Sequence, residues 1–188
     1  MLLEFPVVRA GAEPRPLRVS REATRHPAVA AVLRSDDVSL DEWIRRASLD
    51  DHAAAVDGDG TTLLHCLALR SKTAAMVRLL GSAAERLRPR RDAARDAARR
   101  EGLAARTQDD EDDEVARRET LLAALDAAER LYHAGREAHA RTLLGARDGF
   151  GRTALHYAAA ARGASVRCLV EALPVAGADL SAVGPSGL

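Results

Sequence analysis

Apolar residues recur every three to four positions over most of the chain, which is the spacing of one face of an α-helix. After a stretch rich in proline and arginine, Pro27 is suited to open a first helix. A second helix is predicted from Ser39, which stands three residues before Glu42 in the spacing of a capping box. The single tryptophan, Trp43, is expected to anchor the core of this region. The apolar positions of the second helix are Leu40, Trp43, Ile44 and Ala47.

The same periodicity predicts further helices along the chain. A short helix follows Thr62. Another has Leu79 on its apolar face, and Pro89 is expected either to interrupt this helix or to lie just past its end, because proline breaks a helix interior. The period returns from Val115, and Gly135 is expected to divide this region into two helices. The apolar positions of this last region are Leu121, Leu122, Leu125, Ala128 and Tyr132.

Composition narrows the fold class to all-α. Alanine is abundant and aromatic residues make up only 3% of the chain, which favours closely packed helices over a β-sandwich. Cys66 and Cys168 fall in helical apolar stripes, so we expect buried free thiols rather than a disulfide or metal ligands. The 28 basic and 28 acidic residues balance, and no nucleic-acid partner is expected. No apolar run is long enough to span a membrane, so no membrane partner is expected and the location is expected to be cytoplasmic.

One segment in the middle of the chain is strongly charged. Arginines alternate with alanine pairs from about residue 90, and the run Asp109 to Glu114 is wholly acidic. We interpret the acidic run as a solvated loop that also suits the start of the next helix, where negative charge is favoured. Binding of a basic partner or of Ca²⁺ is an alternative, although the glycine-punctuated spacing of a calcium loop is absent.

Two glycine turns far apart in the chain share one pattern. Asp57-Gly-Asp-Gly-Thr-Thr62-Leu-Leu64-His65 matches Asp148-Gly-Phe-Gly-Arg-Thr153-Ala-Leu155-His156 in its Asp, Gly, Thr, Leu and His positions. Glycine supplies the backbone freedom that a tight turn needs, and a threonine at a helix start can cap a free N–H. A histidine three residues later lies near that turn, so its ring can bond the threonine or a neighbouring backbone group.

This pattern resembles the signature D-x-x-G-x-T-x-L-H-x-A-A of ankyrin repeats, in which a β-turn is followed by two antiparallel helices. The resemblance implies a short ankyrin-type helical solenoid with β-turn or hairpin loops. In the second copy Gly163 ends the inner helix, and 177–182 resembles the segment that closes a repeat, after about three extra residues around Pro174 that should bulge. The residues to which the resemblance gives structural roles are Thr62, His65, Thr153 and His156.

The repeat pattern also predicts the organisation of the chain. The two signature histidines are 91 positions apart, whereas Thr120 precedes Thr153 by 33, the length of one ankyrin repeat. We therefore expect a degenerate middle repeat; the alternative is one large helical insertion and only two repeats. The predicted parts are an N-terminal arm (1–26), a helical cap (27–56), a first repeat (57–88), an Arg/Ala helix and acidic loop insertion (89–114), the degenerate repeat (115–147), a further repeat (148–181) and the start of another (182–188). Either the chain continues beyond that start, or a partner covers the face left exposed.

The sequence carries none of the motifs of familiar enzyme sites. It has no glycine-rich phosphate loop with its lysine, no paired His/Cys spacing for zinc and no Gly-x-Ser-x-Gly turn. Asp50-Asp51-His52 is interpreted as a solvated helix end, because adjacent residues of a helix do not face one another. The chain is therefore expected not to be an enzyme and to use no cofactor, metal or small-molecule substrate.

The leading hypothesis is a scaffold or adaptor that binds a protein partner through its turns. In ankyrin proteins the variable turn positions usually touch the partner, and Phe150 is the best candidate because an apolar side chain at an exposed turn lacks an evident core role. Alternatively, Phe150 packs on the neighbouring turn. The other hypotheses are a structural subunit of a large cytoskeletal or ribonucleoprotein assembly and a regulatory ankyrin segment of a longer enzyme. The partner-binding positions that the resemblance implies are Gly58, Asp59, Thr61, Gly149, Phe150 and Arg152.

Overall fold

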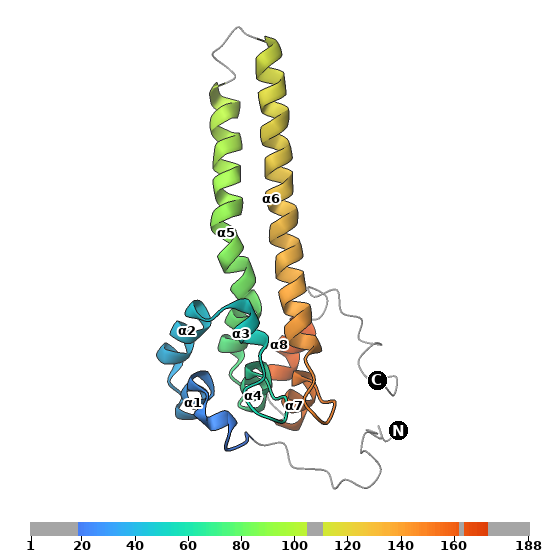
Figure 1. The fold of residues 1–188 in the computed structure, drawn as a ribbon. Helices are drawn as coiled ribbons and strands as arrows, with labels where there is room; N and C mark the ends of the chain where they lie inside the picture. Colours follow the sequence, from blue (N-terminus) through green and yellow to red (C-terminus); the bar gives the residue numbers. More distant parts are fainter. Residues whose placement is uncertain (1–18, 105–110, 162–163, 173–188) are drawn as a thin grey trace. The chain divides into compact units, whose positions relative to one another are not determined.

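The computed structural model describes residues 19–104, 111–161 and 164–172, whose regular structure is helical (Figure 1). The elements are a 3-10 turn, η1 (Ala23–Arg25), and the α-helices α1 (Pro27–Arg34), α2 (Asp37–Arg46), α3 (Leu49–Ala53), α4 (Leu63–Leu69), α5 (Thr73–Ala104), α6 (Glu111–Gly145), α7 (Ala154–Ala161) and α8 (Ser165–Ala172). One isolated antiparallel bridge joins Ala55 to Thr62. The expected all-α class is confirmed for the described residues.

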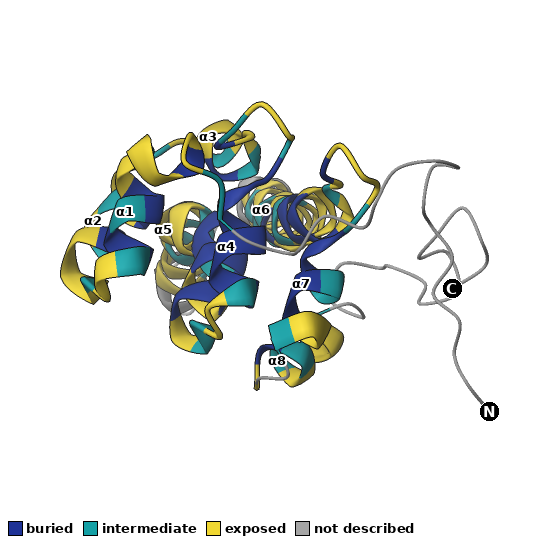
Figure 2. Ribbon diagram, turned by 90° about the horizontal axis from the view of Figure 1, so that it is seen from below, coloured by how far each residue is buried: buried dark blue, intermediate teal, exposed yellow. Residues whose placement is uncertain are grey.

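The contacts within the chain define two compact units. Unit 1 consists of Met1–Ser82 and Glu137–Leu188, and unit 2 of Ala83–Arg136, so that α5 and α6 each contribute to both. In unit 1, α1 packs against α2 and α4, α4 packs against α7, and α7 packs against α8. Figure 2 shows α4, buried over most of its length, between α1 and α7. Two short helices that lie far apart in the sequence are thus direct neighbours.

The core of unit 1 is built from aliphatic side chains of these layers. Leu79 from the start of α5 and Leu143 from the end of α6 are both fully buried in it, although the long segment 83–136 separates them in the chain. Full burial of one such side chain contributes roughly 1.5–3 kcal/mol, so this region is the main source of stability in unit 1. The large side chains that are less than 2% exposed include Leu40, Leu63, Leu64, Leu67, Met76, Leu79, Leu143 and Leu169.

The second helix begins earlier than the sequence pattern predicts. Its N-cap is Asp36, whose carboxylate accepts from the backbone N–H and the hydroxyl of Ser39. The predicted start at Ser39 is therefore wrong, since Ser39 already lies in the first turn of α2. Trp43 is partly buried against the core, with its ring between those of His26 and His52. The expected anchoring role of Trp43 thus takes the form of ring packing.

Helix α5 does not end near Pro89. It continues to Ala104, with Pro89 inside it. Proline lacks the N–H that would bond the carbonyl four residues earlier, which costs about 3 kcal/mol in a helix interior. The alanines and arginines that follow are strong helix formers, and they continue the helix beyond the proline. The predicted boundary between 57–88 and 89–114 consequently falls within a helix.

Helix α6 is likewise one continuous helix. It runs through Gly135, so the predicted division there is wrong, and residues 115–145 contain no helix–turn–helix pair of the kind that a degenerate repeat at 115–147 would need. A Cβ atom added at Gly135 would lie 2.5 Å from Cδ1 of Leu87 on α5. The glycine therefore allows close approach of the two helices of unit 2 and does not form a turn.

Unit 2 is a helical hairpin with a narrow seam. Arg95 on α5 pairs with Glu129 on α6, and the guanidinium of Arg91 lies 4.3 Å from the centre of the Tyr132 ring. Tyr132 is buried, whereas Val115 and Leu122 are more than half exposed. Alanine pairs on α5 offer little apolar depth, and the contacts across the hairpin include the close approach of Leu87 to Gly135, the Arg95–Glu129 pair and the Arg91–Tyr132 contact.

Several predictions lie wholly or partly outside the described residues. They concern the N-terminal arm over 1–18, the beginning of the acidic run, and Gly163 as a helix end. They also concern the bulge around Pro174 and everything from 173 to 188, including the start of a further repeat at 182–188. Of the acidic run, Glu111 to Glu114 belong to the first turn of α6, so this part of the run is helical and not the predicted loop. Its position agrees with the expected preference of a helix start for negative charge.

Candidate interaction surface

The two glycine turns have the same local structure. Asp57 Oδ1 accepts from the N–H of Thr61 at 2.9 Å, and Asp148 Oδ1 accepts from the N–H of Arg152 at 2.8 Å. Each turn contains a glycine with a positive φ, 76° at Gly60 and 77° at Gly151, in the left-handed region that a side chain would disfavour. The Asp-x-x-Gly spacing therefore produces the same turn conformation at both places in the chain.

Each turn leads into a helix through a threonine–histidine pair. Nδ1 of His65 accepts from the N–H of Thr62 at 3.0 Å and lies 2.8 Å from its hydroxyl oxygen. Nδ1 of His156 accepts from the N–H of Thr153 at 3.1 Å and lies 3.0 Å from its hydroxyl oxygen. The ring thus satisfies a backbone donor that the start of a helix would otherwise leave free. The structure places all four residues in local contacts that support the turns.

The first histidine also reaches the second turn. Nε2 of His65 lies 3.1 Å from the carbonyl oxygen of Arg152. A carbonyl only accepts, so Nε2 carries the proton and Nδ1 is the free acceptor, which fixes a neutral tautomer. Burial, the largest cause, holds the pKa of His65 below its ordinary value. His65 is therefore a neutral link between the two turns.

The two turns lie directly side by side. The N–H of Gly149 donates to the carbonyl oxygen of Asp59 at 2.6 Å. A Cβ added at Gly149 would come within 3.1 Å of that same oxygen, so glycine permits this approach. On its other side, the first turn is held by Glu22, whose carboxylate accepts from the N–H of Gly58 at 2.9 Å. The tips form one continuous surface in which Gly58, Asp59, Gly149 and Phe150 are exposed.

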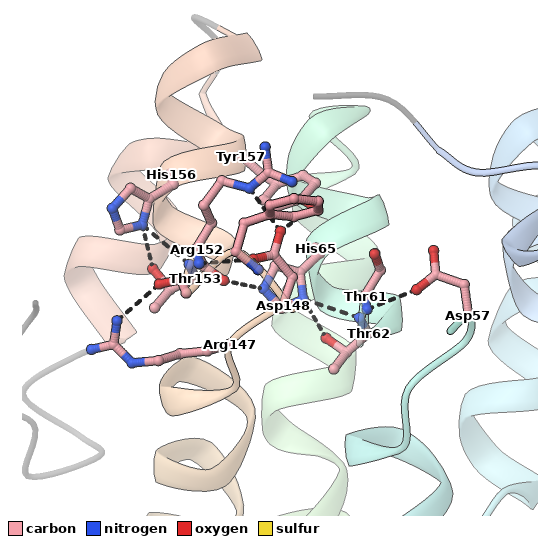
Figure 3. Close-up of polar contacts among 12 residues, drawn as sticks. Asp57, Thr61, Thr62, His65, Arg147, Asp148, Arg152, Thr153, His156 and Tyr157 are labelled. Carbon is pink, nitrogen blue, oxygen red and sulfur yellow. Dashed lines mark hydrogen bonds and ion pairs between the residues drawn. The ribbon is translucent and has the colours of Figure 1, made fainter. Parts of the chain in front are cut away.

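Beneath the second tip, one carboxylate collects several donors (Figure 3). The Asp148 side chain has no exposed surface and accepts from the N–H groups of Phe150 and Arg152. It also accepts from Nε of Arg152 at 2.7 Å and from the hydroxyl of Tyr157 at 2.8 Å. Burial opposes ionisation of Asp148, but the bonds from Arg152 and Tyr157 outweigh it and lower the pKa of the carboxyl. Burial and Asp148 together raise the pKa of Tyr157.

Two of the predicted partner-binding residues are mainly structural. Thr61 is only 5% exposed, so its side chain offers almost no surface to a partner. Arg152 is largely occupied by Asp148 and by His65, and its guanidinium lies 4.7 Å from the centre of the Phe150 ring. Phe150 itself is 37% exposed, so it both packs on a neighbouring side chain and presents apolar surface.

A buried polar cluster in unit 1 was not foreseen. The hydroxyl oxygen of Ser82 lies 3.1 Å from Nδ1 of His52 and 3.0 Å from Nε2 of His139. The other ring nitrogen of His52 is 3.0 Å from the carbonyl oxygen of Ile44. His52 has no exposed surface, so its interpretation as part of a solvated helix end is wrong, whereas Asp51 does cap α3 through Ser48. The cluster joins α3, α5 and α6, and no local sequence pattern indicated it.

The cysteines lie where the apolar pattern predicts, as free thiols. Cys66 is buried in α4 and Cys168 is partly buried in α8. Burial raises the pKa of the Cys66 thiol to about 12, which leaves it protonated and unreactive near neutral pH. Among the described residues, no three His, Cys, Asp or Glu side chains are grouped as a metal site would require. Within the same ranges, no helix combines the length and apolar character needed to cross a membrane.

Comparisons with protein-family models, with curated proteins and with solved structures find no match for this chain.

Proposed function

We propose that this chain is a non-catalytic scaffold or adaptor, built on ankyrin-type repeats, that binds a protein partner through its paired turns. The observation that carries the proposal is the bond from Gly149 to Asp59, which holds two equivalent tips together as one surface. A helix–turn unit that repeats and packs on its own copy is the arrangement of a solenoid, whose tips are free to contact other molecules. The packing of α4 directly on α7 supports two adjacent repeats separated in sequence by a helical insertion.

The chemistry of the surface favours a protein partner. Phe150 provides an apolar contact, and Asp59 provides an exposed carboxylate on the adjoining turn. Aromatic side chains at the centre of a patch often dominate the energy of protein–protein contacts. Asp148 and His65 lie beneath the tips and keep them in a fixed conformation, which reduces the entropy lost on binding. We therefore reduce the proposed set of partner-binding residues to the four exposed ones, Gly58, Asp59, Gly149 and Phe150.

The test is capture of partners by the tagged chain and by Phe150→Ala. Loss of the Phe150 side chain should weaken a genuine tip-mediated interaction at least tenfold while leaving the fold intact. Val38→Ala is the matched control, because Val38 is an exposed apolar side chain on α2 far from the turns in sequence. If Phe150→Ala retained every partner of the wild-type chain, the tips would not be the binding surface.

A second candidate is a structural subunit whose hairpin is enclosed by neighbours. The observation that favours it is the exposure of Val115 (57%), Leu122 (53%) and Leu131 (43%) on α6. Apolar side chains at such exposures on a thin hairpin suit burial in an assembly. Replacing unit 2 (Ala83–Arg136), which carries these side chains, by a short linker and measuring size-exclusion behaviour separates the two candidates, because an adaptor should stay monomeric and keep its tip-mediated partner without this unit.

A further inference from the structure

The hairpin of unit 2 leaves one face of α6 open to solvent. Glu129 and Tyr132 of α6 contact side chains of α5, and Tyr132 is buried there. Val115 and Leu122, in contrast, are both more than half exposed. They stand seven residues apart, about two helical turns, so they lie on the same face of α6. This apolar face is available to a further helix.

Opposite charges stand on either side of Leu122 along this face. Arg118 precedes it by four residues and Asp126 follows it by four, so the three side chains form one stripe on the helix surface. Arg118 is exposed and forms no ion pair with any other described residue. Asp126 pairs with Arg130 of the same helix, but both side chains are largely exposed and such a pair contributes little. The Asp126 carboxylate is therefore still able to bind another cation.

We propose that α6 pairs with α6 of a second copy of this chain, antiparallel and about a two-fold axis at Leu122. The two Leu122 side chains then meet at the axis, and Arg118 of each copy faces Asp126 of the other. Two-fold symmetry makes this ion pair occur twice, because each copy presents the same surface. A parallel pairing would instead set Arg118 against Arg118 and Asp126 against Asp126, and like charges across an interface are unfavourable. The charges therefore select the antiparallel arrangement.

The pairing brings four helices together, two from each hairpin, as in a four-helix bundle. A groove of unit 2 adjoins the proposed contact, because Leu125 in its wall stands one turn after Leu122. The groove gives space to side chains of the second copy. Its lining residues are Asp92, Arg95, Asp96, Ala98, Arg99 and Leu125. The contact face over 115–126 lies within unit 2, so the proposal goes beyond partner binding by the turns and does not depend on it.

The test is sedimentation equilibrium of the full chain over a range of concentrations. The average mass of the wild-type chain should rise toward twice that of the monomer. Leu122→Asp should weaken the association roughly a hundredfold, because it buries two like charges at the axis. Leu131→Asp is the matched control, since Leu131 is an exposed leucine of α6 that stands nine residues further, on the opposite side of the helix. Circular dichroism checks that both variants keep the helix content of the wild-type chain.

A charge exchange tests the orientation of the two helices. Arg118→Asp and Asp126→Arg should each weaken the association about tenfold or more, because each sets like charges opposite one another. The double variant with both substitutions should associate as the wild-type chain does, since the ion pairs are restored with reversed sign. Such a rescue distinguishes contact between copies from a role of either residue in the stability of α6.

Four results would overturn the proposal. A wild-type chain that stays monomeric up to about 1 mM would leave this face to a different protein or to solvent. Association that survives Leu122→Asp, or that Leu131→Asp abolishes, would place the contact elsewhere. A double variant that remains as weak as the single ones would exclude the antiparallel arrangement. Because Phe150 takes no part in this contact, partner capture by Phe150→Ala and the mass of the chain test the two proposals separately.

Discussion

Nε2 of His65 donates to the carbonyl oxygen of Arg152, a residue 87 positions later in the chain. The same ring holds the N–H of Thr62 at its other nitrogen. One neutral imidazole thus closes the start of α4 and ties the first turn to the second. Removal of the His65 ring should therefore destabilise both the start of α4 and the contact between the two turns.

His65→Ala should lower the free energy of unfolding by about 2–4 kcal/mol, because it leaves a buried N–H and a carbonyl unpaired and opens a cavity. His156→Ala, at a partly exposed ring, should cost about half as much. Urea unfolding followed by circular dichroism measures both. His133→Ala, on an exposed ring of α6, is the control and should change little. Equal losses at His65 and His133 would refute the linking role.

Acidification should destabilise the fold through its histidines. Burial lowers the pKa of His65, of His156 and of His26 in the folded state. The unfolded chain therefore binds protons first, at its ordinary histidine pKa of about 6.5, and stability should fall as the pH drops below that value. Unfolding curves at pH 7.5 and 5.5 measure the effect. The difference should shrink in His65→Gln, and a pH-independent stability over this range would contradict the prediction.

Asp148→Asn should loosen the second tip. An amide in place of the carboxylate offers one acceptor fewer and turns a donor toward Arg152 or Tyr157, at a cost of about 2–4 kcal/mol. Asp57→Asn should cost less, because among the described residues the partly buried Asp57 carboxylate accepts from two donors, Thr61 and Ser20. Thermal unfolding ranks the two variants. The reverse order would mean that the Asp148 contacts contribute little.

Pro89→Ala should stabilise unit 2. Alanine restores the N–H that an interior helical position needs, with an intrinsic gain of up to about 3 kcal/mol. Hydrogen exchange of the amides of residues 83–100 should slow by tenfold or more. The control is Arg90→Ala, at the neighbouring exposed position, which should leave exchange nearly unchanged. Faster exchange in Pro89→Ala would show that the proline fits its site better than alanine.

The local features of the turns could be predicted from the sequence because each depends on a few residues near in the chain. The Asp-x-x-Gly spacing and the pairing of threonine with histidine are of this kind, and so is the all-helical class. Long-range consequences could not be predicted in the same way. Nothing local shows that Thr61 is covered, since its burial depends on α7 and its neighbours.

The predictions of a helix break at Pro89 and at Gly135 were wrong for a related reason. Both are helix breakers by intrinsic propensity, but packing decides whether a helix continues. Gly135 stays helical, and its missing side chain leaves room for the side chain of Leu87. Ser82, His52 and His139 form a buried network only because three helices meet there. The N-cap of α2 is ambiguous in the sequence for a simpler reason, because Asp36 and Ser39 are both capping residues and stand three positions apart.

Ser82 and His139 touch where α5 leaves the core of unit 1 and α6 returns to it. Because this contact holds the two ends of the segment between Ser82 and His139 together, equal numbers of helical turns could be added to or removed from α5 and α6 without displacing these two residues. The length of the hairpin is therefore open to evolutionary drift and to engineering, and a foreign antiparallel helix pair could be grafted between these two residues while the paired tips keep their positions.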